Sequence, residues 1–241
     1  MKIHAEALLF DDDGTLVSSL ESVHRCWTRW AGEYGITAED FARVELHGRP
    51  AAEIAADLLP AAVVPESVAR IEELEVEDVA GDVVLLPGTA ALLGSLPAER
   101  WAVVTSATRR LAEARLAEVG VRPKTLIAAD DITRGKPDPE PFLLAARTLG
   151  VDPARCVVFE DAPAGLAAGR AAGMTAAGLA AGRAAGMTTV ALTATHAAGM
   201  TTVALTTTHA ASELVADIVV PDLSAVSAQA TAHGVAITAT A

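Results

Sequence analysis

Residues 8–16 read Leu-Leu-Phe-Asp-Asp-Asp-Gly-Thr-Leu, an apolar run that ends in three acids, a glycine and a threonine. An apolar run bounded by turn residues predicts a buried strand of a parallel sheet. Ligands of open α/β sheets bind at the carboxyl edge of such strands, which is where these acids stand. Side chains two residues apart share a face of an extended segment, so Asp11 and Asp13 can point into one cavity while Asp12 points elsewhere. The stretch therefore predicts a site at the end of a buried strand.

The two carboxylates of Asp11 and Asp13 suggest a particular chemistry. Crowded carboxylates repel each other, which favours a bound cation and can raise the pKa of one of them enough to make it an acid. Gly14 allows a tight turn, and Thr15 offers a hydroxyl and an N–H group to an anion. These groups suit attack of one carboxylate on phosphorus while the other handles protons. An acidic turn without function is the alternative, and other segments must decide between the two.

The composition is that of an acidic globular chain. Its 241 residues suffice for one domain with an insertion or for two modest domains. The net charge of −13 argues against nucleic acid or an anionic membrane as a partner. No apolar run approaches the roughly 20 residues of a membrane span, and the start of the chain turns acidic too soon for a signal peptide, so we expect a cytoplasmic protein. Cys26 and Cys156 lack metal-ligand or redox spacing, so we expect reduced thiols.

After Leu16 the pattern changes from strand to helix. Between 19 and 35, apolar residues recur at three- and four-residue intervals, namely Val23, Cys26, Trp27, Trp30 and Tyr34. We expect these aromatic side chains to be core rather than substrate contacts. Further helices are predicted at 38–45, 50–59 and 65–79. We therefore place an all-helical domain at 17–86, inserted into an α/β core domain formed by 1–16 and 87–241, with hinges near 16–19 and 86–88.

A loop inside this helical insert carries two basic candidates. Residues 45–50 read Glu-Leu-His-Gly-Arg-Pro, so a glycine and a proline interrupt the helical pattern. His47 and Arg49 could reach down to a substrate held at the acidic strand end. A plain helix–helix turn, with Pro50 at the first helical position, is the alternative.

Two later strands end in residues that suit a phosphate. The apolar run 101–104 is followed by Thr-Ser-Ala-Thr-Arg, and a helix that opens near Arg109 can supply donors to an anion. The candidates here are Ser106, Ala107 and Arg109. After a short strand at 126–129, Lys136 stands between Gly135 and Pro137, whose backbones are constrained. An ammonium held in this way would keep a nucleophilic carboxylate ionised and neutralise charge on a transferring phosphoryl group.

A fourth strand, 156–159, ends in Glu160 and Asp161 ahead of a helix. Adjacent acids at such a strand end suit Mg²⁺, which prefers a few carboxylates together with water and substrate oxygens. Four polar segments therefore stand in a fixed order, each after a predicted strand. They are Asp-x-Asp-Gly-Thr at 11–15, the hydroxyl-rich end at 105–108, Gly-Lys-Pro-Asp-Pro at 135–139 and the acids at 160–161.

In this order the four segments resemble the four motifs of the haloacid dehalogenase superfamily phosphatases. The resemblance implies a doubly wound, mostly parallel, Rossmann-like sheet with a helical cap and Mg²⁺ as cofactor. It makes Asp11 the nucleophile, Asp13 the general acid/base, and Ser106 and Lys136 the phosphate ligands. It assigns the metal to Asp11, Asp13 through its carbonyl, Asp161 and Glu160. Asp12 replaces the apolar or amide residue common in the family.

The segments 101–106, 135–141 and 159–165 look like the branch that holds glycerol phosphatases, deoxyhexose-phosphate phosphatases and sugar phosphomutases. We therefore expect a Mg²⁺-dependent hydrolase of small polyol or sugar phosphate monoesters that forms an aspartyl-phosphate. A phosphomutase is the first alternative, because the same motifs serve both reactions. A metal-free dehalogenase would leave the acids without a balancing cation. A catalytically silent or engineered scaffold is the alternative from another class. The expected partner is a small phosphate ester, and the chain is expected to be a monomer or dimer.

The chain repeats itself after the fourth motif. Residues 164–175 recur at 177–188, and residues 185–197 recur with one substitution at 198–210, both with a period of 13 residues. The period is too short and the copies too few for a solenoid. We interpret 164–210 as an internal duplication of one helix-to-strand segment. We expect either 189–192 or 202–205 to lie beside the fourth strand. The other copy would then extend the sheet edge, loop out or exchange with a second molecule.

Overall fold

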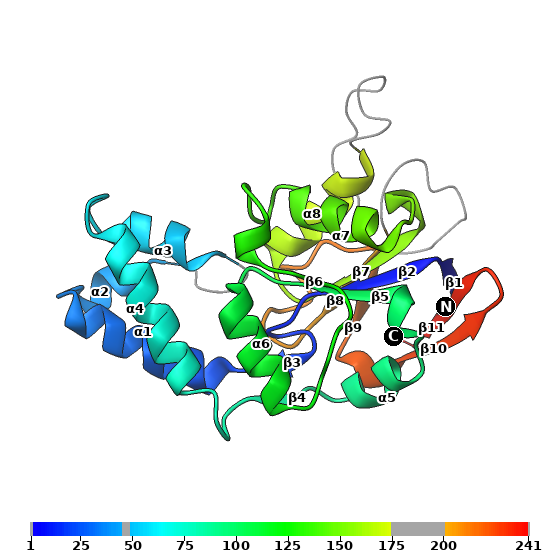
Figure 1. The fold of residues 1–241 in the computed structure, drawn as a ribbon, viewed down its shortest axis with the longest axis horizontal. Helices are drawn as coiled ribbons and strands as arrows, with labels where there is room; N and C mark the ends of the chain where they lie inside the picture. The colour runs from blue at the N-terminus through cyan, green and yellow to red at the C-terminus, as the bar shows by residue number, and fades with distance from the viewer. Residues whose placement is uncertain (1, 45–48, 175–200, 241) are drawn as a thin grey trace.

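The centre of the structure is a sheet of six parallel strands. The computed structural model describes residues 2–44, 49–174 and 201–240. Within them the strand order is β6-β5-β2-β7-β8-β9 (Figure 1). These strands are β2 (Ala7–Phe10), β5 (Trp101–Val104), β6 (Leu126–Ile127), β7 (Cys156–Glu160), β8 (Thr201–Leu205) and β9 (Ile218–Val220). The strand that carries the acids, β2, lies inside the sheet between β5 and β7.

Side chains of β2 alternate between the two faces of the sheet. Leu8 and Phe10 pack with the helices α5 and α6, whereas Ala7 and Leu9 pack with α7 and α8. The four helices are α5 (Thr89–Gly94), α6 (Arg109–Glu118), α7 (Glu140–Leu149) and α8 (Pro163–Met174). A strand covered on both faces must be apolar throughout, which is why residues 7–10 form a continuous apolar run. The predicted doubly wound α/β fold is confirmed.

Four helices form a separate body between β3 and β4. They are α1 (Leu20–Glu33), α2 (Ala38–Phe41), α3 (Ala51–Leu58) and α4 (Val64–Glu77). Trp27 and Trp30 are buried in the apolar core of this body, and the Trp30 indole donates a hydrogen bond to the Ser67 carbonyl at 2.8 Å. The aromatic stripe therefore belongs to the core of this body, as expected, but Trp27 also lines a cavity that contains Asp11 and Asp13. We call residues 17–86 the cap; their assignment as a separate domain stays a prediction.

The two ends of the cap lie side by side. β3 (Val17–Ser18) pairs antiparallel with β4 (Val84–Leu85), so the chain leaves and re-enters the core at one place. The Leu16 carbonyl also accepts hydrogen bonds from the Leu86 N–H and from the Thr89 hydroxyl. The stretch that follows the acids is thereby tied to both cap links.

A second, antiparallel sheet was not predicted. It has the order β1-β11-β10 and lies at the end of the molecule opposite the cap (Figure 1). Its strands are β1 (Lys2–Ala5), β10 (Val226–Thr231) and β11 (Gly234–Ala239). Val235 and Ile237 of this sheet are buried against the same core as β2. The sequence has no long apolar run here, because only one side of each strand faces the core. The chain therefore continues past β9 into two further strands, β10 and β11.

Short 3-10 turns complete the described secondary structure: Ala98–Arg100, Ala129–Asp131, Pro153–Arg155 and Leu223–Ala225. None of the helices in the described parts of the chain is both long and apolar enough to cross a membrane.

One copy of the repeated strand has a defined place. β8 pairs in parallel with β7 and with β9, so the copy at 202–205 fills the position beside the fourth strand. The other copy, 189–192, lies outside the described residues. Its place, and the expected exchange of a strand between molecules, therefore stay predictions.

Candidate active site

The acids gather because three parallel strands end together. Phe10 stands opposite Val103 of β5 and Phe159 of β7 in the sheet register. The residues that follow, Asp11, Val104-Thr105 and Glu160, therefore meet at one carboxyl edge. Asp11 also donates its backbone N–H to the Phe159 carbonyl at 3.0 Å, which prolongs the pairing of β2 and β7 by one residue. The predicted site lies at the carboxyl ends of the strands, as in other open α/β sheets.

Lys136 is buried among these acids. Its Nζ atom lies 2.5 Å from Asp11 Oδ1 and 2.6 Å from Glu160 Oε1, and the residue is 1% exposed. The Phe142 ring packs against the Lys136 ammonium, with its centroid 5.4 Å from Nζ. A buried ammonium without acids would be strongly destabilising, so Lys136 and its two partners must be present together.

Glu160 is a fully buried carboxylate whose two oxygens have different partners. Oε1 accepts from Lys136, while Oε2 accepts the backbone N–H groups of Asp161 and Ala162 at 3.0 and 2.9 Å. Gly165 leaves room for this arrangement, because a Cβ atom at that position would lie 1.7 Å from Glu160 Oε1. Glu160 therefore fixes the position of Lys136 in addition to its predicted role toward a metal.

Asp161 is held by hydroxyl groups from two segments. The Thr15 hydroxyl donates to Oδ1 at 3.2 Å, and the Thr208 hydroxyl donates to Oδ2. Gly14 approaches the same carboxylate closely; its φ is +85°, and a Cβ atom there would lie 2.1 Å from Asp161 Oδ2. Thr15, predicted to bind an anion, thus contacts an acid through its hydroxyl. Thr208 was not predicted. The run of threonines at 206–208, after β8, is nevertheless the same hydroxyl-rich signal as the one after β5.

The charges in this cluster favour a divalent cation. Carboxylate oxygens of Asp11, Glu160 and Asp161 lie within 4.8 Å of one another, and all three residues are buried. Burial raises the pKa of Asp11 well above its usual range, although the Lys136 ammonium opposes this. Burial and the Glu160 carboxylate raise the pKa of Asp161 to about 7. Oxygen ligands of this number and hardness fit Mg²⁺, which would supply the charge that one ammonium cannot.

A small cavity of about 80 Å³ opens from Asp11 toward the cap. Asp13, Ser106 and Ala107 line it from the core, and Arg49 lines it from the cap. Ala107 donates its N–H to the Thr105 hydroxyl at 3.1 Å, a bond that turns the chain after β5. The fold therefore brings most of the predicted catalytic and phosphate-binding residues to one cavity.

The cap residue Arg49 is partly shielded. Its guanidinium pairs with Asp57 at 2.9 Å and lies 3.8 Å from Glu53, both on α3. Arg49 stands just before α3, which begins after Pro50, so its side chain is close to the acids of this helix. The same side chain lines the cavity. His47 lies outside the described residues, so its predicted role is neither supported nor opposed.

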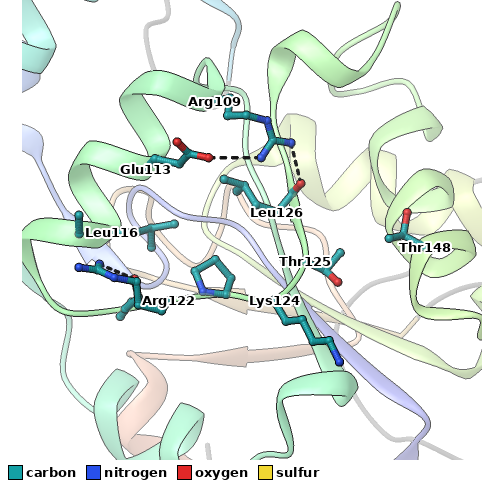
Figure 2. Close-up of a pocket in the computed structure, with 11 residues that line it drawn as sticks. Arg109, Glu113, Leu116, Arg122, Lys124, Thr125, Leu126 and Thr148 are labelled. Carbon is teal, nitrogen blue, oxygen red and sulfur yellow. Dashed lines mark hydrogen bonds and ion pairs between the residues drawn. The ribbon is translucent and has the colours of Figure 1, made fainter.

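Arg109 points away from the acids, contrary to our expectation. Its guanidinium binds the Leu126 carbonyl at 3.1 Å and lies 3.6 Å from Glu113 (Figure 2). It also pairs with Asp131 at 2.6 Å. Arg109, Glu113 and Leu126 line a different cavity, of about 510 Å³, beside the edge strand β6. The helix α6 does begin at Arg109, but the local acids draw the side chain outward. The structure therefore does not bring the Arg109 side chain to the acids, and its contact with phosphate stays a prediction.

Two buried charged residues in the cavity were not predicted. Arg115 of α6 and Glu75 of α4 both line it, and their side chains pair at 3.1 Å. Arg115 also lies 3.6 Å from Asp13 Oδ2. Arg115 follows Leu111 by four residues and therefore stands on the apolar stripe of its helix. A charged residue in such a stripe was the signal that could have revealed it.

Asp12 is fully buried and has no hydrogen-bond partner for either side-chain oxygen among the described residues. Burial raises its pKa to about 7, opposed by the Arg115 guanidinium. Its backbone carbonyl is well used, since it accepts the N–H groups of Thr15, Leu16 and Val17. Alternation along the chain turns Asp12 away from the cavity, as expected, but directs it into the interior rather than to solvent.

Fold and site together define a doubly wound α/β domain with an acidic, lysine-bearing centre beneath a helical cap. The chain belongs to the haloacid dehalogenase-like hydrolase family, whose model matches residues 5–173. The resemblance inferred from the four motifs is confirmed.

Relatives with named activities cover most of the chain. Hexitol phosphatase A of Escherichia coli is 38% identical over 71% of this chain and 81% of its own length. Glycerol-1-phosphate phosphohydrolase 2 of Saccharomyces cerevisiae is 36% identical over 72% of this chain and 74% of its own length. A hydrolase from Pseudomonas syringae has a similar structure, with a TM-score of 0.70, 22% identity and coverage of 91% and 94% of the two chains. The last likeness concerns the fold alone.

Asp12 makes the stability of the folded protein depend on pH. The pKa of its carboxyl, ordinarily 3.8, is about 7 in the folded protein because the group is buried. Between these values the folded state binds a proton that the unfolded chain has lost, so stability falls as pH rises. Asp12→Asn, which keeps the shape without the charge, should equal the parent near pH 4. Above pH 7 it should be more stable by up to about 4 kcal/mol, at ~1.4 kcal/mol per pKa unit.

The comparison requires urea unfolding of both proteins at pH 4.5, 6 and 8. A constant difference between the two free energies of unfolding across this range would show that Asp12 does not titrate in this way.

Thr207 distinguishes the two copies of the repeated strand. Its hydroxyl donates to the Gly14 carbonyl, whereas the first copy has Ala194 at the equivalent position. Deleting 185–197 or 198–210 leaves two chains of equal length that differ only in this residue. We expect both to fold, and the chain that keeps Thr207 to be more stable by about 1 kcal/mol, the net value of one hydrogen bond. Denaturant unfolding measures the difference; failure of both chains to fold would show that both copies are required.

Proposed function

We propose that the protein is a Mg²⁺-dependent phosphatase of small polyol or sugar phosphate monoesters that acts through a phosphorylated Asp11. The observation that carries this proposal is the ion pair between Asp11 and the buried Lys136 at the end of β2. The Lys136 ammonium, together with a bound Mg²⁺, would oppose the effect of burial on the pKa of Asp11, so that its carboxylate could act as an ionised nucleophile. The ammonium could also neutralise charge on an incoming phosphate. The activities named for the relatives support this class of substrate.

The proposed reaction has two steps. The Asp11 carboxylate attacks phosphorus, the bond to the ester oxygen breaks, and Asp13 in its acid form gives its proton to the leaving alkoxide. Asp13, now ionised, takes a proton from water as that water attacks the phosphorus of the acyl phosphate. This releases inorganic phosphate and restores the Asp11 carboxylate. The opening of the cavity beside both aspartates is consistent with one substrate meeting the two groups in turn.

Other residues of the cavity orient the phosphate. Lys136 would bind a phosphoryl oxygen while it remains paired with Glu160, and the Ser106 hydroxyl would bind another. Asp11, Asp161, Glu160 and the Asp13 carbonyl are the groups that would hold Mg²⁺. The bound ion would neutralise charge on the phosphate and the clustered acids. Asp161 is already oriented for this by Thr15 and Thr208.

The cavity favours a small, polar substrate. It is only about 80 Å³ in volume, and cap residues close it opposite Asp11. Arg49 offers a charge to the part of the substrate that is not transferred, whereas Trp27 and Ile54 offer apolar surface. The small size and polar lining of the cavity favour a small polyol phosphate over a nucleotide or a phosphoprotein.

Replacement of the nucleophile should abolish turnover. We expect Asp11→Asn to lower the release of inorganic phosphate from glycerol phosphate by about 10³-fold or more, because an amide cannot form the acyl phosphate. The matched control is Asp12→Asn, the same chemical change one residue away and outside the cavity, which should keep activity near that of the parent. A colorimetric assay for phosphate provides the measurement. An Asp11→Asn protein as active as Asp12→Asn, with contamination excluded, would contradict the mechanism.

A panel of esters separates hydrolysis from the alternative reaction, transfer of the phosphoryl group within or between sugars. With glycerol, hexitol and deoxyhexose phosphates we expect inorganic phosphate and the free polyol or sugar, and loss of activity in EDTA that Mg²⁺ restores. Interconversion of sugar phosphate isomers without release of phosphate would favour a mutase. Full activity in EDTA would contradict metal dependence and favour a different reaction class.

A further inference from the structure

The cap helix α4 and the core helix α6 meet along a line of polar contacts, which we call the α4–α6 seam. The Thr108 hydroxyl donates to Glu72 at 3.1 Å, the Arg115 guanidinium pairs with Glu75 at 3.1 Å, and the Gly81 N–H donates to Glu118 at 3.0 Å. Each contact joins a residue at or just beyond α4 to a residue at or within α6. The contacts of the seam therefore depend on how the cap packs against the core.

The central contact of the seam differs from the other two in its burial. Arg115 is 4% exposed and Glu75 is 6% exposed. Removing two such charges from water is costly, and their attraction only partly offsets that cost, so a buried pair is weak evidence for stability. Both residues also line the cavity that contains Asp11 and Asp13. The position of the pair thus points to a role in the reaction.

Arg115 is shared between the cap and the proposed acid/base. One terminal nitrogen, Nη2, bonds to Glu75, and the other, Nη1, lies 3.6 Å from Asp13 Oδ2, beyond hydrogen-bond distance. The guanidinium is a rigid fork, so the direction of one arm sets the direction of the other. The second oxygen of Asp13 accepts the Ser19 N–H at 3.2 Å, and Ser19 immediately precedes α1 of the cap. Both oxygens of Asp13 are therefore connected to the cap.

We infer that Arg115 is a positioning residue that couples the seating of α4 on the core to the orientation of the Asp13 carboxylate. With α4 seated, Glu75 holds the guanidinium back from Asp13, whose Oδ2 then stays available for proton transfer. When α4 moves away from α6, Glu75 moves with it, and Asp13 is the acid that remains near Arg115. Arg115 and Asp13 then form a direct ion pair that occupies Oδ2. This inference rests on the proposed function, in which Asp13 handles the proton.

Glu75→Gln tests the coupling, because the amide keeps the shape of the side chain but no longer holds the guanidinium by charge. We expect kcat for phosphate release to fall about tenfold while KM changes less than threefold. We also expect the double variant Glu75→Gln/Arg115→Gln to be no slower than Glu75→Gln, since the competing pair with Asp13 is gone. Independent structural damage would instead make the two losses multiply.

The matched control is Glu72→Gln. Glu72 lies on the same helix and in the same seam, but its partner is Thr108 rather than a group that reaches Asp13. We expect its kcat to stay within twofold of the parent. Thermal unfolding of each variant reports on folding, and Arg115→Lys, which keeps the charge but not the fork, replaces Arg115→Gln if the latter is unfolded. In that case Arg115→Lys should lower kcat by a larger factor than that by which it changes KM.

Hydrogen exchange of the Ser19 amide gives a readout that does not depend on activity. Because this amide donates to Asp13, we expect it to exchange faster in Glu75→Gln than in Glu72→Gln or the parent. Equal exchange in all three proteins, or losses of kcat that multiply in the double variant, would overturn the coupling. A parent protein that releases no phosphate from any ester of the panel would overturn the proposed function, while the exchange measurement would still decide the inference.

Discussion

The buried ammonium of Lys136 is the group on which the site depends. It lies between Asp11 and Glu160, and these three side chains come from separate segments that only the parallel sheet brings together. Burial alone would lower the pKa of Lys136, but the two carboxylates outweigh it and raise that pKa above its usual value. Loss of either acid would leave the buried ammonium with one partner in place of two, so the ends of β2 and β7 and the loop around residue 136 depend on one another.

The same charges explain why the centre is suited to a cation. Three buried carboxylates, those of Asp11, Glu160 and Asp161, face one ammonium. The protein holds them in place with hydroxyl and backbone N–H donors rather than with further cations, since Thr15 and Thr208 bind Asp161 and two N–H groups bind Glu160. Hydrogen bonds of this kind orient the acids without neutralising them, so the cluster keeps its affinity for a hard cation.

The cap and the core contribute different things to the cavity. The core supplies the reacting carboxylates at fixed positions on the edge of the sheet, whereas the cap supplies Arg49, Glu75 and apolar surface on a body with its own hydrophobic core. A cap that folds around its own core can move as a unit, because its helices keep their packing when the seam with α6 opens. The pair between Glu75 and Arg115 is the most deeply buried contact of this seam.

The sequence by itself determined the sheet, the helical insert and the family, because each rests on local patterns. The apolar run before Asp11 and the stripe through Trp27 and Trp30 are periodic signals, and the four motifs follow strands in a fixed order. The tertiary structure alone decided where individual side chains point. Arg109 turned toward Asp131, Thr15 toward Asp161, and Arg115 into the cavity, in each case because the partner lies on a segment distant in the chain or on a neighbouring strand end. Periodicity records which face of an element is buried, but it carries no information about which charge on another element that face will meet.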